Sequence, residues 1–197
     1  DPSGLLFDQS SNQSEKIGLR VDYDREIDAI PGARVTAGLD TLQDETYQEL
    51  IQTGRNWVPE TKFTSVAPFV QAYQALLDGR MTLSAGARHE FAKLEVDDFE
   101  TLYNYGPQQV SGGAPDFEET LWNAGATLEI VDGLTGYASY SQGFTMADVG
   151  RILRGVSTPG QDVDTFLDVE PVVSDNQELG LEYRGGAITA SAAYFWS

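Results

Sequence analysis

Apolar and polar side chains alternate residue by residue along much of this chain. Between Lys16 and Tyr23 the odd positions are apolar, whereas the even positions are charged or glycine. A repeat of two residues is typical of a β-strand with one apolar and one polar face. The pattern returns along the chain and predicts about eight strands. They lie at Ile17–Tyr23, Val35–Leu39, Thr64–Leu76, Met81–Phe91, Trp122–Ile130, Leu134–Gln142, Gln177–Tyr183 and Ile188–Trp196.

The connections between these strands are of two kinds. The short ones contain Pro-Gly, Asp-Gly or Gly-Gly, as tight turns require because positive φ angles occur there. They hold Pro31-Gly32, Asp78-Gly79, Asp132-Gly133 and Gly185-Gly186, and the long polar ones are Gln43–Lys62, Lys93–Glu118 and Phe144–Glu170. Short and long connections alternate, so all the long ones fall at one end of the sheet. Transmembrane barrels show this asymmetry, with short periplasmic turns and long extracellular loops.

The predicted fold is therefore all-β, an antiparallel up-and-down meander of about eight strands that is a segment of a large transmembrane β-barrel. Arg20, Arg34 and Arg88 lie on the polar faces, as expected for a water-filled lumen. Aromatic rings gather near strand ends, as they do at a bilayer interface. These rings are Tyr23, Trp122, Tyr183, Tyr194 and Trp196.

The register of the strand Thr64–Leu76 stays open. Phe69 and Tyr73 share a parity with the polar Gln71, so either face of this strand could point towards lipid. The outermost strands, Ile17–Tyr23 and Ile188–Trp196, would be open edges, and such edges recruit partners. We therefore expect the isolated chain to self-associate.

The composition argues against several classes of function. The chain has 197 residues with 12 Lys plus Arg against 31 Asp plus Glu, which gives a formal net charge of −19. Such a surface repels the phosphates of nucleic acids, so no nucleic-acid partner is expected. There is no Cys and only one His, His89, which argues against a Cys nucleophile, a Cys-based zinc site and a His-based triad. We predict no enzyme activity, no cofactor and no metal site.

Three stretches on these strands resemble one family. Leu83–His89 is similar to its Gly-x-Arg-aromatic strand end, Leu134–Phe144 to its Tyr-rich strand ending in Gly-Phe, and Val169–Tyr183 to its Pro-Glu-x-Ser-x-x-x-Glu-Leu-Gly stretch. The family is that of the TonB-dependent outer-membrane receptors. Order and spacing fit as well, so the resemblance covers most of Lys62–Ser197 and, more loosely, Ser14–Leu42.

The chain also departs from the family pattern. Val172 stands where the family usually has Glu, His89 where it has Tyr, and Thr145–Asp148 where it has Arg-Ala-Pro. No TonB box, plug-domain motif or closing C-terminal strand is recognisable. A 22-stranded wall needs about 220 residues at roughly ten residues per strand. We expect residues 1–197 to be part of one receptor β-barrel domain.

The resemblance implies an outer-membrane location in a Gram-negative cell and a role in active transport of a ferric siderophore or a similar scarce nutrient. The TonB complex would supply energy through a plug domain, and lipid would surround the wall. Two alternatives stay open: a self-contained eight-stranded outer-membrane barrel with a structural or adhesion role, and a soluble β-sandwich that binds carbohydrate. Glycines on the polar face favour a wide wall over a small barrel, whose interior is filled by side chains. They are Gly18, Gly38, Gly86, Gly125 and Gly180.

The long connections hold the candidate ligand-binding residues. Aromatic rings can stack on a flat chelate, and arginines can pair with its anionic oxygens. The candidates are Tyr47, Arg55, Trp57, Tyr103, Tyr105, Arg151 and Arg154. Packing of the loops against each other is the alternative for these rings, and also for a short helix expected within Met146–Arg154. His89 is expected to be an interface ring.

Overall fold

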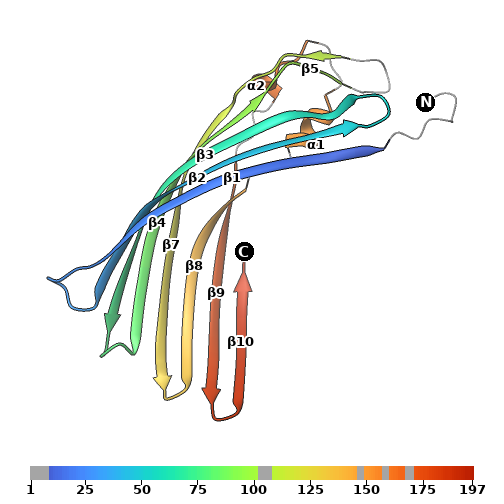
Figure 1. The fold of residues 1–197 in the computed structure, drawn as a ribbon. Coiled ribbons are helices and arrows are strands. Elements are labelled where there is room, and N and C mark those ends of the chain that lie inside the picture. The colour runs from blue at the N-terminus through green and yellow to red at the C-terminus, as the bar shows by residue number, and fades with distance from the viewer. Residues whose placement is uncertain (1–8, 102–107, 146–148, 157–159, 167–170) are drawn as a thin grey trace.

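Long strands lying side by side make up almost all of the structure (Figure 1). It is a computed structural model that describes residues 9–101, 108–145, 149–156, 160–166 and 171–197. The strands are β1 (Ser10–Glu26), β2 (Ala33–Leu50), β3 (Arg55–Leu76), β4 (Met81–Val96), β5 (Phe99–Glu100), β6 (Gln109–Val110), β7 (Asp116–Val131), β8 (Leu134–Thr145), β9 (Val172–Gly185) and β10 (Ile188–Trp196). The helices are α1 (Val149–Arg154) and α2 (Val163–Phe166). The predicted all-β class is confirmed.

One antiparallel sheet holds eight of the strands, in the order β1-β2-β3-β4-β7-β8-β9-β10, and β5 pairs with β6 separately. Each strand of the large sheet pairs with the next one along the chain, so the predicted meander is confirmed. In the described ranges β1 and β10 each pair with one strand only, and the sheet is open. Because it is a single open layer, both alternative architectures, the β-sandwich and the closed eight-stranded barrel, are wrong.

The predicted polar loop Gln43–Lys62 is wrong in its extent. β2 runs to Leu50 and β3 starts at Arg55, so the turn comprises only residues 51–54. The hairpin continues through polar pairs: the hydroxyls of Thr46 and Thr61 lie 2.8 Å apart, and Lys62 Nζ lies 3.7 Å from Glu45. Backbone pairing needs no apolar face where a strand stands in water, and the loss of apolar alternation was therefore no sign of a strand end.

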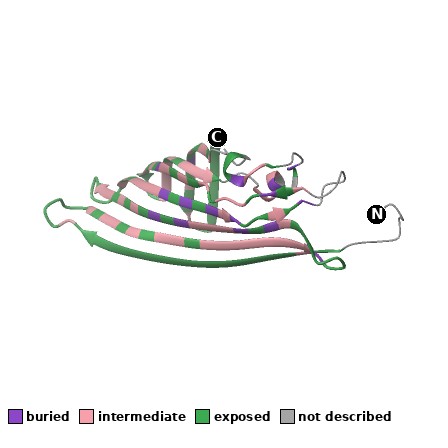
Figure 2. Cartoon of the chain, turned by 90° about the horizontal axis from the view of Figure 1, so that it is seen from above, coloured by how far each residue is buried: buried purple, intermediate pink, exposed green. Residues whose placement is uncertain are grey.

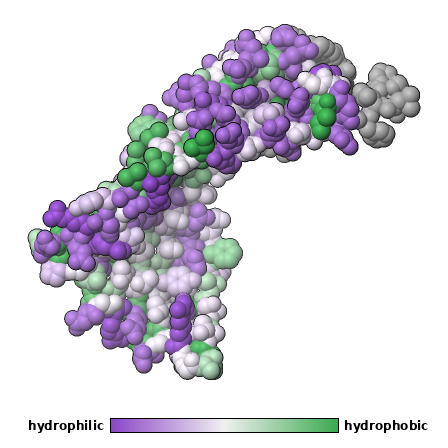
Figure 3. Space-filling view, viewed as in Figure 1, coloured by the Kyte–Doolittle hydropathy of each residue, from purple (hydrophilic) through white to green (hydrophobic). Residues whose placement is uncertain are grey.

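The register sorts the alternating residues onto two faces, here named the apolar face and the polar face. On the apolar face Val21 lies opposite Leu39, which pairs with Pro68. Apolar side chains stay exposed there, as Leu19 (62%) and Leu181 (49%) show. No described element covers this face, which is what a lipid-facing wall requires. Figure 3 shows hydrophilic residues gathered over the end where β5 and the helices lie.

Burial is concentrated on the polar face at the end with the long connections. We call the buried residues there the loop core; they are Leu94, Val96, Val110, Leu153, Val156 and Val163. Figure 2 shows buried positions on the middle strands and in the helical segment, whereas β1 is exposed almost throughout. Within the described ranges, neither helix has the length and hydrophobicity of a membrane-crossing helix.

Candidate functional site

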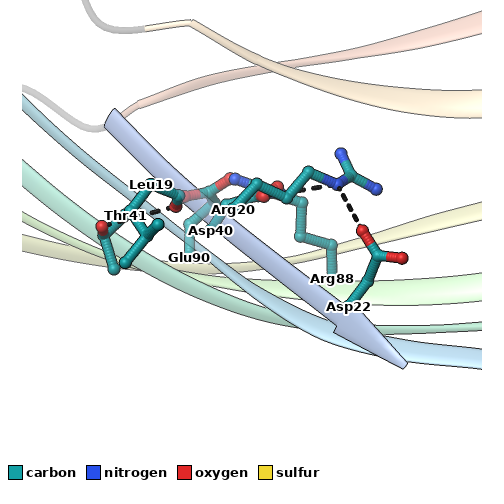
Figure 4. Close-up of polar contacts among 7 residues, drawn as sticks. All are labelled: Leu19, Arg20, Asp22, Asp40, Thr41, Arg88 and Glu90. Atoms are coloured by element: carbon teal, nitrogen blue, oxygen red, sulfur yellow. Dashed lines mark hydrogen bonds and ion pairs between the residues drawn. The ribbon is translucent and has the colours of Figure 1, made fainter. Parts of the chain in front are cut away.

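Arg88 links β2 to β4 across β3 on the polar face (Figure 4). From β4, its guanidinium group forms ion pairs with Asp40 of β2 and with Glu90 of β4. It can reach across β3 because the residue between Asp40 and Glu90 is Ala67, whose small side chain is completely buried. The three charged side chains are 31%, 20% and 9% exposed. Because they are mostly buried, their mutual pairing matters for the stability of the wall.

Arg20 of β1 extends this network and rests on an aromatic ring. Its guanidinium carbon lies 4.6 Å from the centroid of the Phe69 ring. Its Nε lies 3.5 Å from Asp22 and 3.7 Å from Asp40. A methyl group at Gly38 would come within 2.6 Å of the Phe69 ring. The glycine therefore lets the ring approach the backbone of β2.

A second arginine rests on an aromatic ring of β3, at Tyr73. Arg34 lies 4.7 Å from the centroid of the Tyr73 ring, and its Nε lies 3.6 Å from Asp24. A cation over an aromatic face is attracted by the ring quadrupole. Phe69 and Tyr73 thus belong to the polar face as supports for arginines, which answers the open question of register in β3.

A second polar group lies on β8 and β9. The hydroxyl of Tyr137 donates to the carboxylate of Glu178 at 2.6 Å. Gly180 leaves room for the Tyr137 ring, because an added methyl group would overlap it. Glu182 forms an ion pair with Arg184. In these contacts of the polar face, Glu178 is paired with a tyrosine hydroxyl and only Glu182 with a cation.

The two longest connections pack together through the loop core. Leu153 of α1 is completely buried, and Phe63, Phe99 and Phe117 pack against the loop core from the strands. The predicted short helix within Met146–Arg154 is confirmed as α1, and it packs the loops as expected. The β4–β7 and β8–β9 connections thus share one hydrophobic core.

Hydrogen bonds join the same two connections. The amide of Ser111 donates to the carbonyl of Gln161 at 3.2 Å, and the amide of Val163 donates to the carbonyl of Ser111 at 3.0 Å. The Asp164 carboxylate accepts from the amide of Ala114 at 2.7 Å. The two connections are therefore expected to move as one unit.

Asp162 caps the start of α2. Its carboxylate accepts a hydrogen bond from the backbone amide of Thr165 at 2.6 Å. This bond, helped by the Thr165 hydroxyl, lowers the pKa of Asp162, because both donors stabilise the ionised carboxylate. Asp162 therefore stays charged at neutral pH and keeps its cap.

The sequence-predicted ligand residues have different positions. Tyr47 lies on β2, and Arg55 and Trp57 lie on β3, all at the tip of one hairpin. Arg151 and Arg154 belong to α1, which contacts β3; their side chains lie outside the description. Tyr103 and Tyr105 lie outside the described residues. In the described part of the chain, no hydrogen bond or ion pair joins Tyr47, Arg55 and Trp57 to one another.

His89 lies on the apolar face. Its Nδ1 lies 2.7 Å from the Thr120 hydroxyl, and its ring meets Phe91 edge-on with centroids 4.4 Å apart. In the described ranges, no three His, Asp or Glu side chains gather as metal ligands. An interface ring accounts for both contacts.

Sequence reasoning missed the pairing of Arg88 with Asp40 and the loop core. Asp40 and Arg88 are 48 residues apart, and no local pattern reveals such a contact. One signal of the arginine stacks was visible in the sequence. Phe69 and Tyr73 occupy the same alternate positions as the polar Gln71, and so lie on the polar face with the arginines.

Comparison with protein families finds one match that covers nearly the whole chain. Residues 3–197 match the family model described as TonB dependent receptor-like, beta-barrel. Two curated proteins are similar to the chain. It is 23% identical to the ferric aerobactin receptor of Klebsiella pneumoniae and 26% identical to the rhizobactin receptor of Rhizobium meliloti. The alignments cover 97% and 99% of this chain but 31% and 30% of those receptors, so the chain spans about a third of their length.

Solved structures agree on the fold. The structure of the copper transporter OprC superposes with a TM-score of 0.73 at 15% identity, over 94% of this chain and 30% of that one. At such low identity the likeness concerns the fold alone. It shows that the open sheet follows the curvature of a wall segment in a much larger barrel.

Proposed function

Because the chain belongs to the TonB-dependent receptor-like β-barrel family, we propose that it forms part of the wall of an outer-membrane receptor for a ferric siderophore or a similar scarce nutrient. The family comprises transporters and receptors of the outer membrane and not enzymes. The observation that carries the proposal is the single curved sheet with an uncovered apolar face and a charged polar face. The family model matches residues 3–197, which include this sheet.

The wall keeps its backbone hydrogen-bonded in lipid and keeps its lumen polar. Lipid offers no partners to backbone amides, so strands must pair with each other all round. In the complete receptor, further strands would pair with the free edges of β1 and β10. On this proposal, residues 1–197 form one portion of a barrel domain.

Ligand recognition is assigned to the end with the long connections. The two curated relatives are named for ferric aerobactin and for rhizobactin, which favours an iron chelate as ligand. Tyr47, Arg55 and Trp57 stand at the tip of the β2–β3 hairpin, and α1 with Arg151 and Arg154 contacts β3. Tyr103 and Tyr105 in the β4–β7 connection would complete the set. Arginines must bind the chelate locally, because the chain as a whole is acidic.

The energy for uptake is proposed to come from the TonB complex acting on a plug domain. This follows from family membership, since a barrel wall has no chemistry of its own to drive transport.

Iron uptake by the complete receptor tests the proposal. Cells that lack other siderophore receptors would express it, and uptake of radioactive iron would be followed with ferric aerobactin and with ferric rhizobactin. We expect uptake of at least one chelate in cells with TonB and none in cells without it. Uptake that is independent of TonB would contradict the energy source, and no uptake of these or other iron chelates would contradict the ligand class.

Variants at the hairpin tip test the candidate site. W57A with R55Q is expected to weaken chelate binding, whereas R25Q, near the opposite end of β1, is the matched control for loss of one arginine. Equal binding by all variants would remove the hairpin tip from the site.

A further inference from the structure

β7 and β8 stop pairing with each other before either strand ends. Their ladder ends at Asn123 and Ser141. β7 nevertheless stays paired with β4 as far as Asp116, and β8 stays paired with β9 as far as Thr145. The two strands diverge towards the end with the long connections (Figure 1). Within the described ranges, the edge of β7 from Asp116 to Trp122 has no strand partner.

Side chains satisfy backbone groups where the strands separate. The next ladder pair would be Trp122 with Gln142, but the amide of Trp122 donates instead to the side-chain oxygen of Gln142 at 3.1 Å. One step further, the amide of Thr120 donates to the carboxylate of the neighbouring Glu119 at 3.1 Å. The amides of Trp122 and Thr120 therefore both point to the unpaired side of β7.

The backbone groups of Asp116 and Glu118 point to that same side, because alternate residues of a strand share one direction of hydrogen bonding. No strand pairs with them in the described part of the chain. An unpaired strand edge is a template for another extended chain.

The unpaired edge stands on the water side of the membrane interface. Trp122 lies on the apolar face and is 56% exposed, as expected for a ring of the aromatic girdle. Asp116 and Glu118 share its face but lie nearer the long connections. On the proposed function, the edge would therefore face the outside of the cell and lie beyond the lipid.

Negative charge surrounds the edge. Asp116, Glu118 and Glu119 lie on β7, and Asp175 lies on β9 beside Gln142, to which it is hydrogen-bonded at 3.1 Å. Asp116 and Glu118 form no ion pair within the described chain, because the nearby Lys93 is paired with Glu95 at 2.9 Å. Uncompensated acids along a strand edge repel acidic segments and attract basic ones.

We propose that the β7 edge from Asp116 to Trp122 is a docking site for an extended, basic peptide segment of an extracellular partner protein. The segment adds to the sheet as a strand, and its amides and carbonyls pair with those of Asp116 and Glu118. Its lysines or arginines lie opposite the acidic side chains, where cross-strand pairs of opposite charge are favourable. This site is separate from the hairpin tip proposed for the chelate and does not depend on transport.

Binding of a defined peptide to the complete receptor in lipid nanodiscs tests the proposal. The probe is a short fluorescent peptide in which Lys and Thr alternate, and fluorescence anisotropy measures its affinity. We expect binding, with slower hydrogen exchange at the amides of Asp116 and Glu118. The variant D116K/E118K should weaken binding about tenfold or more, because favourable cross-strand pairs become repulsive. The control E60K/D97K carries the same charge change elsewhere and should bind normally.

A second peptide separates strand addition from simple charge attraction. It carries N-methyl groups on alternate residues, which block one edge of the peptide but leave its charge unchanged. Weaker binding of this peptide is expected. Equal binding of the two peptides, equal effects of the two charge variants, or no binding of the unmodified peptide would each overturn the docking site.

Discussion

At the scale of single residues, the polar face depends on where each cation finds its carboxylates. Arg88 pairs with both Asp40 and Glu90, whereas Arg20 and Arg34 also rest on aromatic rings of β3. These contacts cross strands that are distant in sequence. They therefore hold the strands of the wall in register as well as neutralising charge.

Replacing Arg88 should destabilise the receptor. R88Q leaves the carboxylates of Asp40 and Glu90 close together without a cation, and Glu90 is buried. We expect the free energy of unfolding to fall by about 1–3 kcal/mol, as for other half-buried pairs that lose one partner. Urea titration followed by tryptophan fluorescence would measure it.

The control for this change is R25Q, since Arg25 is exposed and has no ion pair in the described chain. It should change stability by no more than about 0.5 kcal/mol. The double variant R88Q/E90Q should regain part of the loss, because the unpaired buried carboxylate is gone. If R88Q is as stable as R25Q, the network does not stabilise the wall.

At the scale of elements, the sequence allowed prediction of the strands but not of their full lengths. The alternation at Ile17–Tyr23 identified β1 because lipid imposes one apolar face there. Above the lipid the same strands carry polar residues on both faces. The pattern therefore predicts a loop over residues 55–62, although they begin β3. Pairing of polar strands depends on a partner strand and leaves no periodic signal.

The loop core was beyond prediction for a related reason. Leu94, Val110 and Leu153 come from three separate segments, and no local pattern shows that they meet. The helix α1 could be predicted because Val149, Ile152 and Leu153 fall on one side of it. The residues that α1 packs against could not.

Truncation of Leu153 should loosen both long connections together. L153A removes a completely buried side chain from the loop core, a change that costs about 2–5 kcal/mol in well-packed cores. Hydrogen exchange at the amides of Val96, Ser111 and Val163 should therefore become faster.

Exchange in β8, β9 and β10 should not change, since the loop core lies at one end of the wall. The control S111A alters an exposed side chain in the β4–β7 connection and should leave the loop-core amides protected. Faster exchange confined to α1 in L153A would mean that the two connections move independently.

At the scale of the whole molecule, one face of the wall must meet lipid and the other must meet water. Ala126 lies on the apolar face between Leu83 and Ala138, and its neighbour Thr127 lies on the polar face between Thr82 and Tyr137. Adjacent residues thus give a matched pair for testing the two faces.

An arginine should be tolerated on one face only. A126R places a charge near the middle of the lipid belt and should cost about 2–4 kcal/mol of folding free energy in lipid. T127R places the same side chain in the lumen and should cost much less. Equal stability of the two variants in urea titrations of the receptor in vesicles would contradict the assignment of the faces.

The isolated chain should associate through its open edges. β1 and β10 each pair with one strand only in the described chain, and the apolar face is uncovered. We expect oligomers, or a requirement for detergent, in sedimentation experiments. A stable monomer in plain buffer would show that neither the edges nor the apolar face recruit partners.

The most direct test of the account is a spin-label scan along β7 of the complete receptor in vesicles. The chain has no Cys, so single cysteines from Trp122 to Glu129 can be labelled one at a time, provided that the rest of the receptor has no free cysteine. Oxygen, which concentrates in lipid, should relax the labels at even positions. A water-soluble nickel chelate should relax those at odd positions. A uniform response, or one in which lipid contacts the odd positions, would contradict the transmembrane wall.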